Sequence, residues 1–325
     1  MNTGIMRLVR NLILISVPLI LMCIYAYFMP MSYMTEEYPM WMEEKNYVNQ
    51  NEKASPTTLI IGDSRAKSGV LPGELCPDGS AYNIAIGGAT SIEMYYALRN
   101  YLKYHEAPDT ALVIFAPFHF YEIDNWGQTL YYNYLTLPEI IEIEANAAML
   151  RDKRVQYSGW LADILSFKLR LPNKYLDQIY ISRFGRNGEK NREKYERIQR
   201  EYGFTSFGEE EGNDGLAYEA HKKEFELSPM SDLYYLRLLD LLKSHGIRVF
   251  IIQAPLNKAT DKVITEKFRS AYTAYMEGIA EKYPDFTVET KVPAYDNAFF
   301  GDNNHLNRRG AEKFTKEIGE RYRGF

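Results

Sequence analysis

Cysteine and histidine are scarce in this chain, and both shortages limit its chemistry. Only two of the 325 residues are cysteine, Cys23 in an apolar N-terminal segment and Cys76 alone in the remainder. An intrachain disulfide is therefore not expected, although an exported protein can also simply avoid cysteine. The five histidines show no metal-ligand spacing beyond one turn near the C-terminus. Neither a metal nor another cofactor is predicted.

An excess of positive charge is also lacking. The formal net charge is −5 and the sequence pI is about 5.7, so a nucleic-acid partner is not expected. Hydrophobic residues make up 46% of the chain and aromatic residues 14%, which excludes a disordered protein. Tyrosine is abundant, at 27 residues. It can serve exposed binding surfaces or fill a half-buried periphery, and composition leaves both open.

The first thirty residues carry a membrane-targeting pattern. Arg7 and Arg10 precede an uncharged apolar run at 12–29, and four glutamates follow between 36 and 44. Eighteen helical residues span roughly 27 Å, about the thickness of a bilayer core. The charge asymmetry predicts a single-pass cell-membrane protein with a cytoplasmic N-terminus and an extracytoplasmic domain. A cleaved signal peptide is the alternative, but no small-x-small site follows, which favours a retained anchor over residues 1–30.

Beyond the anchor, residues 31–56 are polar and irregular and are interpreted as a tether. Residues 57–325 then alternate between two patterns. Short apolar runs predict strands at 57–61, 82–86, 111–115, 248–253 and 286–290, and helical spacing appears at 91–104, 233–244, 261–283 and 308–322. Continuous apolar strands separated by helices are typical of a parallel sheet covered on both faces. The predicted fold class is α/β, a three-layer α/β/α domain.

The stretch from about 120 to 230 breaks this alternation. It is rich in Tyr, Arg, Lys and Glu, with a charged helical segment near 187–203. An insertion after the third strand would lie at the carboxyl edge of the sheet, where active sites of open α/β sheets form. It can be a lid or cap over a site, or a solvated excursion with no direct role.

The sharpest local motif is Gly62-Asp63-Ser64, directly after the first predicted strand. A serine hydroxyl becomes nucleophilic when a base takes its proton, and a tight strand-to-helix turn presents it to substrate. The Ser64 N–H at a helix start can also donate to a developing oxyanion. Alone, however, Gly-Asp-Ser is also an ordinary turn and helix-cap sequence.

A second motif near the C-terminus strengthens the first. Asp302 stands three residues before His305. An Asp-x-x-His turn can place the carboxylate on the imidazole Nδ1, which turns Nε2 toward a serine. The two motifs together predict a Ser64–His305–Asp302 catalytic triad.

These blocks resemble the SGNH (GDSL-type) hydrolases over about residues 57–119 and 231–322. In that family the nucleophile follows the first strand, an oxyanion glycine the second and an asparagine the third, and Asp-x-x-His lies near the C-terminus. The resemblance implies a flavodoxin-like fold and places Gly88 at the oxyanion position. Gly88 can also be a turn glycine before the next helix.

The third block departs from the family pattern. His119 occupies the place where the family has asparagine. Its imidazole could donate to the oxyanion, contact substrate, or be a packed side chain with no catalytic role. The departure leaves Ser64 and Gly88 as the firmer oxyanion donors and makes lipase-like activity doubtful.

Within the superfamily, the anchor, the GDSRAKSGVLP segment and the strand ending Gln253-Ala254-Pro255 are similar to one branch. It comprises the SGNH-like proteins that accompany membrane-bound O-acyltransferases in alginate O-acetylation and teichoic-acid D-alanyl transfer. The resemblance implies an O-acyltransferase that works through a Ser64 acyl-enzyme. Its partners would be a multi-span membrane-bound O-acyltransferase and a cell-surface polysaccharide or teichoic-acid-like acceptor.

Two other functions remain open at this stage. An esterase would run the same first half-reaction and finish with water, and a non-catalytic accessory subunit would only dock on the acyltransferase. The triad motif does not separate transfer from hydrolysis, and the sequence identifies neither the acyl group nor the acceptor. A surface glycan-binding module would rest on tyrosine abundance alone.

Overall fold

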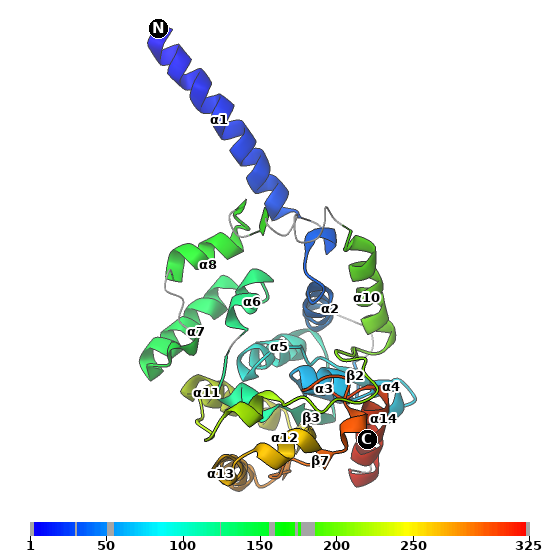
Figure 1. Cartoon of the computed structure of the whole chain (residues 1–325). Coiled ribbons are helices and arrows are strands. Elements are labelled where there is room, and N and C mark those ends of the chain that lie inside the picture. The colour runs from blue at the N-terminus through cyan, green and yellow to red at the C-terminus, as the bar shows by residue number, and fades with distance from the viewer. Residues whose placement is uncertain are drawn as a thin grey trace.

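The computed structural model describes residues 3–29, 31–50, 55–123, 125–155, 160–172, 175–176 and 186–322. It is a mixed α/β structure with a long apolar helix at its N-terminus (Figure 1). The helices are α1 Thr3–Tyr27, α2 Tyr38–Asn49, α3 Ser64–Gly69, α4 Pro72–Leu75, α5 Ser91–Tyr104, α6 Trp126–Tyr131, α7 Leu137–Leu150, α8 Trp160–Lys168, α10 Gly188–Arg200, α11 Pro229–Ser244, α12 Lys258–Val263, α13 Glu266–Lys282 and α14 Arg308–Arg321. Short 3₁₀ turns are η1 Met31–Tyr33, η2 Pro117–Phe120, η3 Lys153–Val155, η4 Tyr218–His221 and η5 Asn297–Phe299.

Five strands form the central sheet, in the order β2-β1-β3-β4-β6, and every pairing is parallel. They are β1 Thr58–Gly62, β2 Ala81–Asn83, β3 Thr110–Ile114, β4 Arg248–Ile251 and β6 Thr287–Val288. The five strands predicted from apolar runs are all present, although the second, fourth and last are shorter than predicted. A small second sheet, β5 Leu256–Asn257 with β7 Ala294–Tyr295, was not predicted because two-residue strands leave no pattern.

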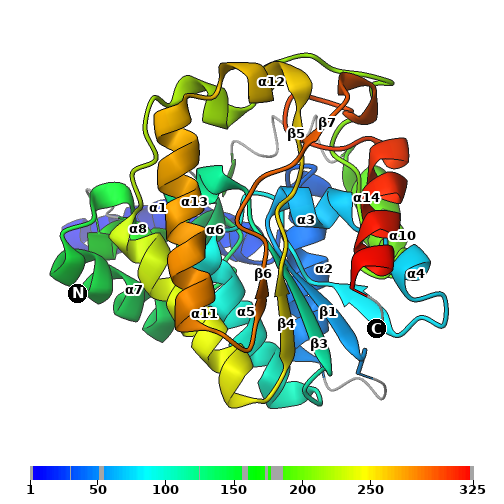
Figure 2. The same cartoon turned by 90° about the horizontal axis from the view of Figure 1, so that it is seen from below.

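Alternate residues of the central strands pack into two separate cores. On β1, Leu59 and Ile61 belong to the larger core and Ile60 to the smaller one, and all three are fully buried. Because successive side chains of a strand point to opposite faces, both faces of the sheet are covered. Figure 2 shows α11 and α13 on one side of the sheet and α14 on the other. The apolar strands predicted a parallel, doubly covered sheet for this reason.

Helix α1 extends away from the rest of the chain (Figure 1). Of the described residues, only Gly4–Tyr27 forms a helix long and apolar enough to cross a membrane, and its mean hydropathy is 2.1. The helix contains Pro18, which transmembrane helices tolerate. An apolar N-terminal helix of membrane-spanning length is thus present, as the sequence indicated.

The tether predicted for residues 31–56 is wrong for residues 38–49, which form α2. This helix packs against α5 and α10, and its Trp41 is 1% exposed. The polarity that suggested a tether comes partly from Glu43 and Glu44, which are buried and accept hydrogen bonds from Tyr82 and Tyr134. Burial raises the pKa of Glu44 to about 8, against the opposing effect of the Tyr134 hydrogen bond.

The region predicted as an insertion, about 120–230, is largely helical where the structure describes it. It comprises α6, α7, α8 and α10, and then an irregular segment that returns across the sheet edge through η4. The charged helix predicted near 187–203 is confirmed as α10.

Candidate active site

Ser64 is the first residue of α3, directly after β1. The turn requires Gly62 because a Cβ there would lie 1.8 Å from the carbonyl oxygen of Ile114 on β3. Asp63 caps α3: its Oδ1 accepts from the Arg65 N–H at 2.8 Å and its Oδ2 from the Ala116 N–H at 2.6 Å. The serine therefore stands on a turn that is fixed to the end of the neighbouring strand.

Asp302 and His305 form a hydrogen-bonded pair in the loop before α14. The His305 Nδ1 lies 2.8 Å from Oδ2 and 3.0 Å from Oδ1 of Asp302. Oδ1 also accepts from the backbone N–H groups of Asn304 and His305. Burial alone would raise the pKa of Asp302, but the His305 ring and these N–H groups hold it below its usual value. The carboxylate is thus placed to hold the imidazole through Nδ1, and Nε2 has no hydrogen bond to any described residue.

One cavity of about 230 Å³ brings these elements together at the carboxyl edge of the sheet. Ser64, Gly88, His119 and His305 all line it, and Asp302 stands behind His305. Between the described side chains of Ser64 and His305 no hydrogen bond is formed in this conformation. Such contacts are often long in enzymes without substrate and tighten when substrate binds. The other residues that line this cavity are Glu37, Arg65, Gly87, Ala116, Phe118, Asn125, Gln128, Phe207, Tyr218 and Asn304.

Gly88 lies two residues before the N-cap of α5, where Thr90 and Glu93 form a capping box. Its φ is +78°, and a Cβ would lie 2.2 Å from the side-chain nitrogen of Asn125. The positive φ favours glycine, and a side chain here would have to displace that of Asn125. Gly88 is therefore a turn glycine and at the same time part of the cavity wall.

His119 lies in η2, after β3, and is 7% exposed. Its Nε2 is 3.7 Å from Oδ2 of Asp63, too long for a hydrogen bond. Its Nδ1 is buried and has no hydrogen-bond partner among the described residues. The structure thus places His119 in the wall of the same cavity as Ser64, with one ring nitrogen unsatisfied.

A buried ion pair beside Ser64 was missed by sequence reasoning. The Nη2 of Arg65 lies 2.7 Å from Oε2 of Glu219, and both side chains are almost fully buried. Burial opposes the charge of Arg65, yet Glu219 raises its pKa. The other Glu219 oxygen accepts from the Phe118 N–H at 3.4 Å. Glu219 therefore joins the nucleophile turn to the segment after β3.

The segment that was predicted as an insertion supplies part of the cavity wall. The Phe207 ring packs on the His305 ring at 4.7 Å, and Tyr218 stacks on Phe118 at 4.5 Å between centroids. Gly208 packs directly on Gly301, since a Cβ at Gly208 would lie 2.2 Å from the Gly301 carbonyl carbon. These contacts favour a cap over a solvated excursion for this part of the insertion.

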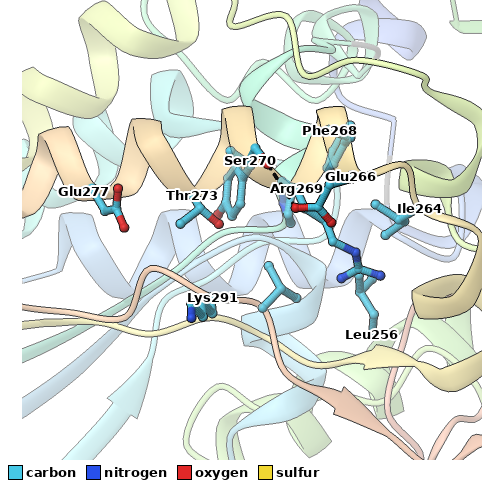
Figure 3. A pocket seen from close by; sticks show the side chains of 12 residues that line it. Leu256, Ile264, Glu266, Phe268, Arg269, Ser270, Thr273, Glu277 and Lys291 are labelled. Carbon is cyan, nitrogen blue, oxygen red and sulfur yellow. Dashed lines mark hydrogen bonds between the residues drawn. The ribbon is translucent and has the colours of Figure 1, made fainter.

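Two further features bear on cofactors and ligands. Among the described residues, no group of three or more His, Cys, Asp or Glu side chains lies close enough to hold a metal ion. A larger cavity, of about 490 Å³, lies between α13 and β5 (Figure 3). Its mixed lining includes Glu266, Arg269 and Lys291, and none of the predicted site residues belongs to it.

Comparison with known proteins does not identify a family for this chain. No known protein family and no curated protein matches the chain. A solved structure from Streptococcus pneumonia, provisionally described as a platelet activating factor, aligns over 99% of each chain at 12% identity with a TM-score of 0.35. That similarity is too low to argue from.

Proposed function

We propose that the chain is an SGNH-type serine enzyme that works as an O-acyltransferase on a cell-surface polysaccharide or similar polymer. The observation that carries the proposal is the single cavity lined by Ser64, Gly88 and His305, with Asp302 hydrogen-bonded behind His305. This cavity then brings together a nucleophile, a base, a group that orients the base, and candidate oxyanion donors.

The proposed first half-reaction forms an acyl-enzyme. Ser64 Oγ attacks the carbonyl carbon of an acyl donor while His305 Nε2 takes the hydroxyl proton. The N–H groups of Ser64 and Gly88 stabilise the oxyanion. The tetrahedral intermediate collapses, and His305 returns the proton to the departing oxygen.

In the second half-reaction an acceptor hydroxyl of the polymer attacks the acyl carbon. His305 takes the acceptor's proton and passes it to Ser64 Oγ as the bond between Oγ and the acyl carbon breaks, which releases the new ester. Water in place of the polymer would make the enzyme an esterase. Two aromatic residues support transfer: Phe207 covers one face of His305, and Tyr218, half-exposed, offers a surface on which a sugar can stack.

The proposed architecture is the three-layer α/β/α arrangement of SGNH proteins. The strand order β2-β1-β3-β4-β6 and the two cores support it, since flavodoxin-like sheets have an equivalent order. The proposed topology has a cytoplasmic N-terminus, supported by Arg7 and Arg10 before the apolar helix. A multi-span membrane-bound O-acyltransferase is the proposed source of the acyl group.

The nucleophile is tested with a serine-directed fluorophosphonate on the full chain in detergent. Wild type should be labelled covalently and Ser64→Ala should not. Ser270→Ala, at an exposed serine on α13, is the matched control and should label fully. Equal labelling of wild type and Ser64→Ala would disprove the assignment.

Transfer is separated from hydrolysis by its products. The protein is given an activated acyl ester with and without an oligosaccharide acceptor, and both products are followed by mass spectrometry. Acylated oligosaccharide that requires Ser64 supports transfer, whereas free acid alone across a range of glycans identifies an esterase. Neither product, together with no labelling of Ser64, would identify a non-catalytic accessory subunit.

A further inference from the structure

Helix α7 presents an apolar face to solvent. Its exposed residues include Ile141, which is 45% exposed, and Met149, which is 69% exposed. Pro138, Ala145 and Ala148 are exposed on the same stripe, at helical spacing. A surface helix of a soluble domain normally shows polar residues on this side.

The acidic residues of α7 point the other way. Glu139 and Glu144 are buried, and Glu139 pairs with Arg99. Glu142 forms an ion pair with Arg237 of α11 at 2.8 Å. The charges of α7 thus face the protein or its flanks, and the apolar side chains remain outside. Such an arrangement is typical of a helix face that contacts another apolar surface.

Helix α8 repeats the pattern. Ala162 and Leu165 on its exposed side, and Leu169 in the turn just after it, follow at helical spacing, and Leu165 is 38% and Leu169 53% exposed. Ile164 and Phe167 on the opposite side are buried. The exposed large apolar residues of the two helices and of the turn after α8, which we call the apolar surface, are Ile141, Met149, Leu165 and Leu169.

This apolar surface begins where α1 ends. Arg170, which follows Leu169, donates from Nη1 to the backbone oxygens of Tyr27 and Met29, both at 3.4 Å. Phe28, between them, is 73% exposed. Figure 1 shows α8 beside the lower end of α1, with α7 on the same side of the molecule. Leu169, next to Arg170, therefore lies close to the end of the membrane-spanning helix.

Two exposed basic residues directly follow α7. Arg151 and Lys153 are exposed, and neither forms an ion pair within the described part of the chain. Free cations next to an apolar helix face are typical of helices that lie on anionic bilayers.

We propose that α7 and α8 lie on the surface of the bilayer that α1 spans, with the apolar surface in the boundary between headgroups and acyl chains. The contact of Arg170 with the end of α1, and the exposed cations after α7, favour lipid over a second copy of the chain. The domain then contacts the membrane in two ways, through the spanning helix α1 and through the apolar surface of α7 and α8. The inference requires that α1 spans the bilayer, and it is independent of the proposed chemistry at Ser64.

The test uses the full chain in liposomes that contain anionic lipids and no other protein. In a Cys23→Ala, Cys76→Ala background, single cysteines are placed by Met149→Cys, Leu165→Cys or, as the control, Val263→Cys. Val263 on α12 is 49% exposed, so its exposure matches that of the test positions. Each cysteine carries an environment-sensitive fluorophore, and lipids with brominated acyl chains act as the quencher.

We expect a blue shift and a loss of fluorescence at positions 149 and 165, and neither change at position 263. Equal responses at all three positions would overturn the proposal. Energy transfer between copies at positions 149 and 165, without quenching by brominated lipid, would overturn it in favour of a self-association surface. Thermal melting followed by circular dichroism in the same samples reports the integrity of the domain.

Discussion

Two aspartate–histidine pairs lie beside Ser64, and their aspartates make different contacts. Both Asp302 oxygens lie within 3.0 Å of the His305 Nδ1, and the Asp302 side chain is 35% exposed. Asp63 is fully buried, and its two oxygens accept hydrogen bonds from the backbone N–H groups of Arg65 in α3 and of Ala116 after β3. His119 approaches it only to 3.7 Å.

The different hydrogen-bond partners of Asp302 and Asp63 indicate two different roles for an aspartate beside a histidine. Asp302 is arranged to orient an imidazole, whereas Asp63 holds the nucleophile turn to the segment after β3. We therefore expect substitutions at Asp302 to act on the reaction and substitutions at Asp63 to act on stability. The orientation of the His119 ring should therefore depend less on Asp63 than the orientation of the His305 ring depends on Asp302.

The largest expected effect is on turnover in Asp302→Asn. An amide cannot hold the imidazole in the same tautomer, so acyl turnover should fall ~10⁴-fold while the melting temperature changes little. The control is Asp296→Asn, since Asp296 lies on the same loop and caps η5 without touching His305. Near wild-type turnover in Asp302→Asn would reduce the triad to a dyad.

The opposite result is expected for Asp63→Ala. Removing the carboxylate leaves the N–H groups of Arg65 and Ala116 buried without partners, which should lower the free energy of unfolding by about 3 kcal/mol. Urea denaturation measures the loss, and Asp302→Ala should lose clearly less. If Asp63→Ala were as stable as wild type but inactive, the distinction between the pairs would fail.

His119 offers a smaller test of the same comparison. If its free Nδ1 acts as an oxyanion donor, His119→Ala should lower acyl turnover ~10²-fold. His119→Asn should restore most of it, because an amide can donate from a similar place. Loss of turnover without rescue by asparagine would indicate another role, and full turnover in His119→Ala would make it a packed side chain.

Local motifs explain what the sequence could predict. The strands are continuous apolar runs, and Ser64, Gly88 and the Asp302–His305 turn each sit in a short segment whose residue types fit one chemistry. Each of these segments ends at the same sheet edge, so their meeting in one cavity follows from a parallel sheet.

The parts that could not be predicted depend on distant partners. Arg65 and Glu219 are 154 positions apart, and nothing near either residue indicates the other. Phe207 reaches His305 from an insertion without sheet pattern. Helix α2 was missed because Glu43 and Glu44 look solvent-exposed in sequence, whereas both are buried and accept hydrogen bonds from Tyr82 and Tyr134.

The smallest expected effect is an acid-dependent change in stability at Asp302. Its pKa is lowered from the ordinary 3.8 because the hydrogen bonds from His305 and the backbone outweigh burial. A carboxyl group whose pKa is lower in the folded state stabilises that state above its unfolded pKa. The contribution is lost as the pH falls through the folded pKa.

Wild type should therefore lose its advantage over Asp302→Asn as the pH falls below about 4, where ordinary aspartates begin to protonate. Partial solvent exposure keeps the effect small. Urea denaturation of both proteins between neutral pH and acid measures it, and a difference that stays constant with pH would show that Asp302 has no lowered pKa.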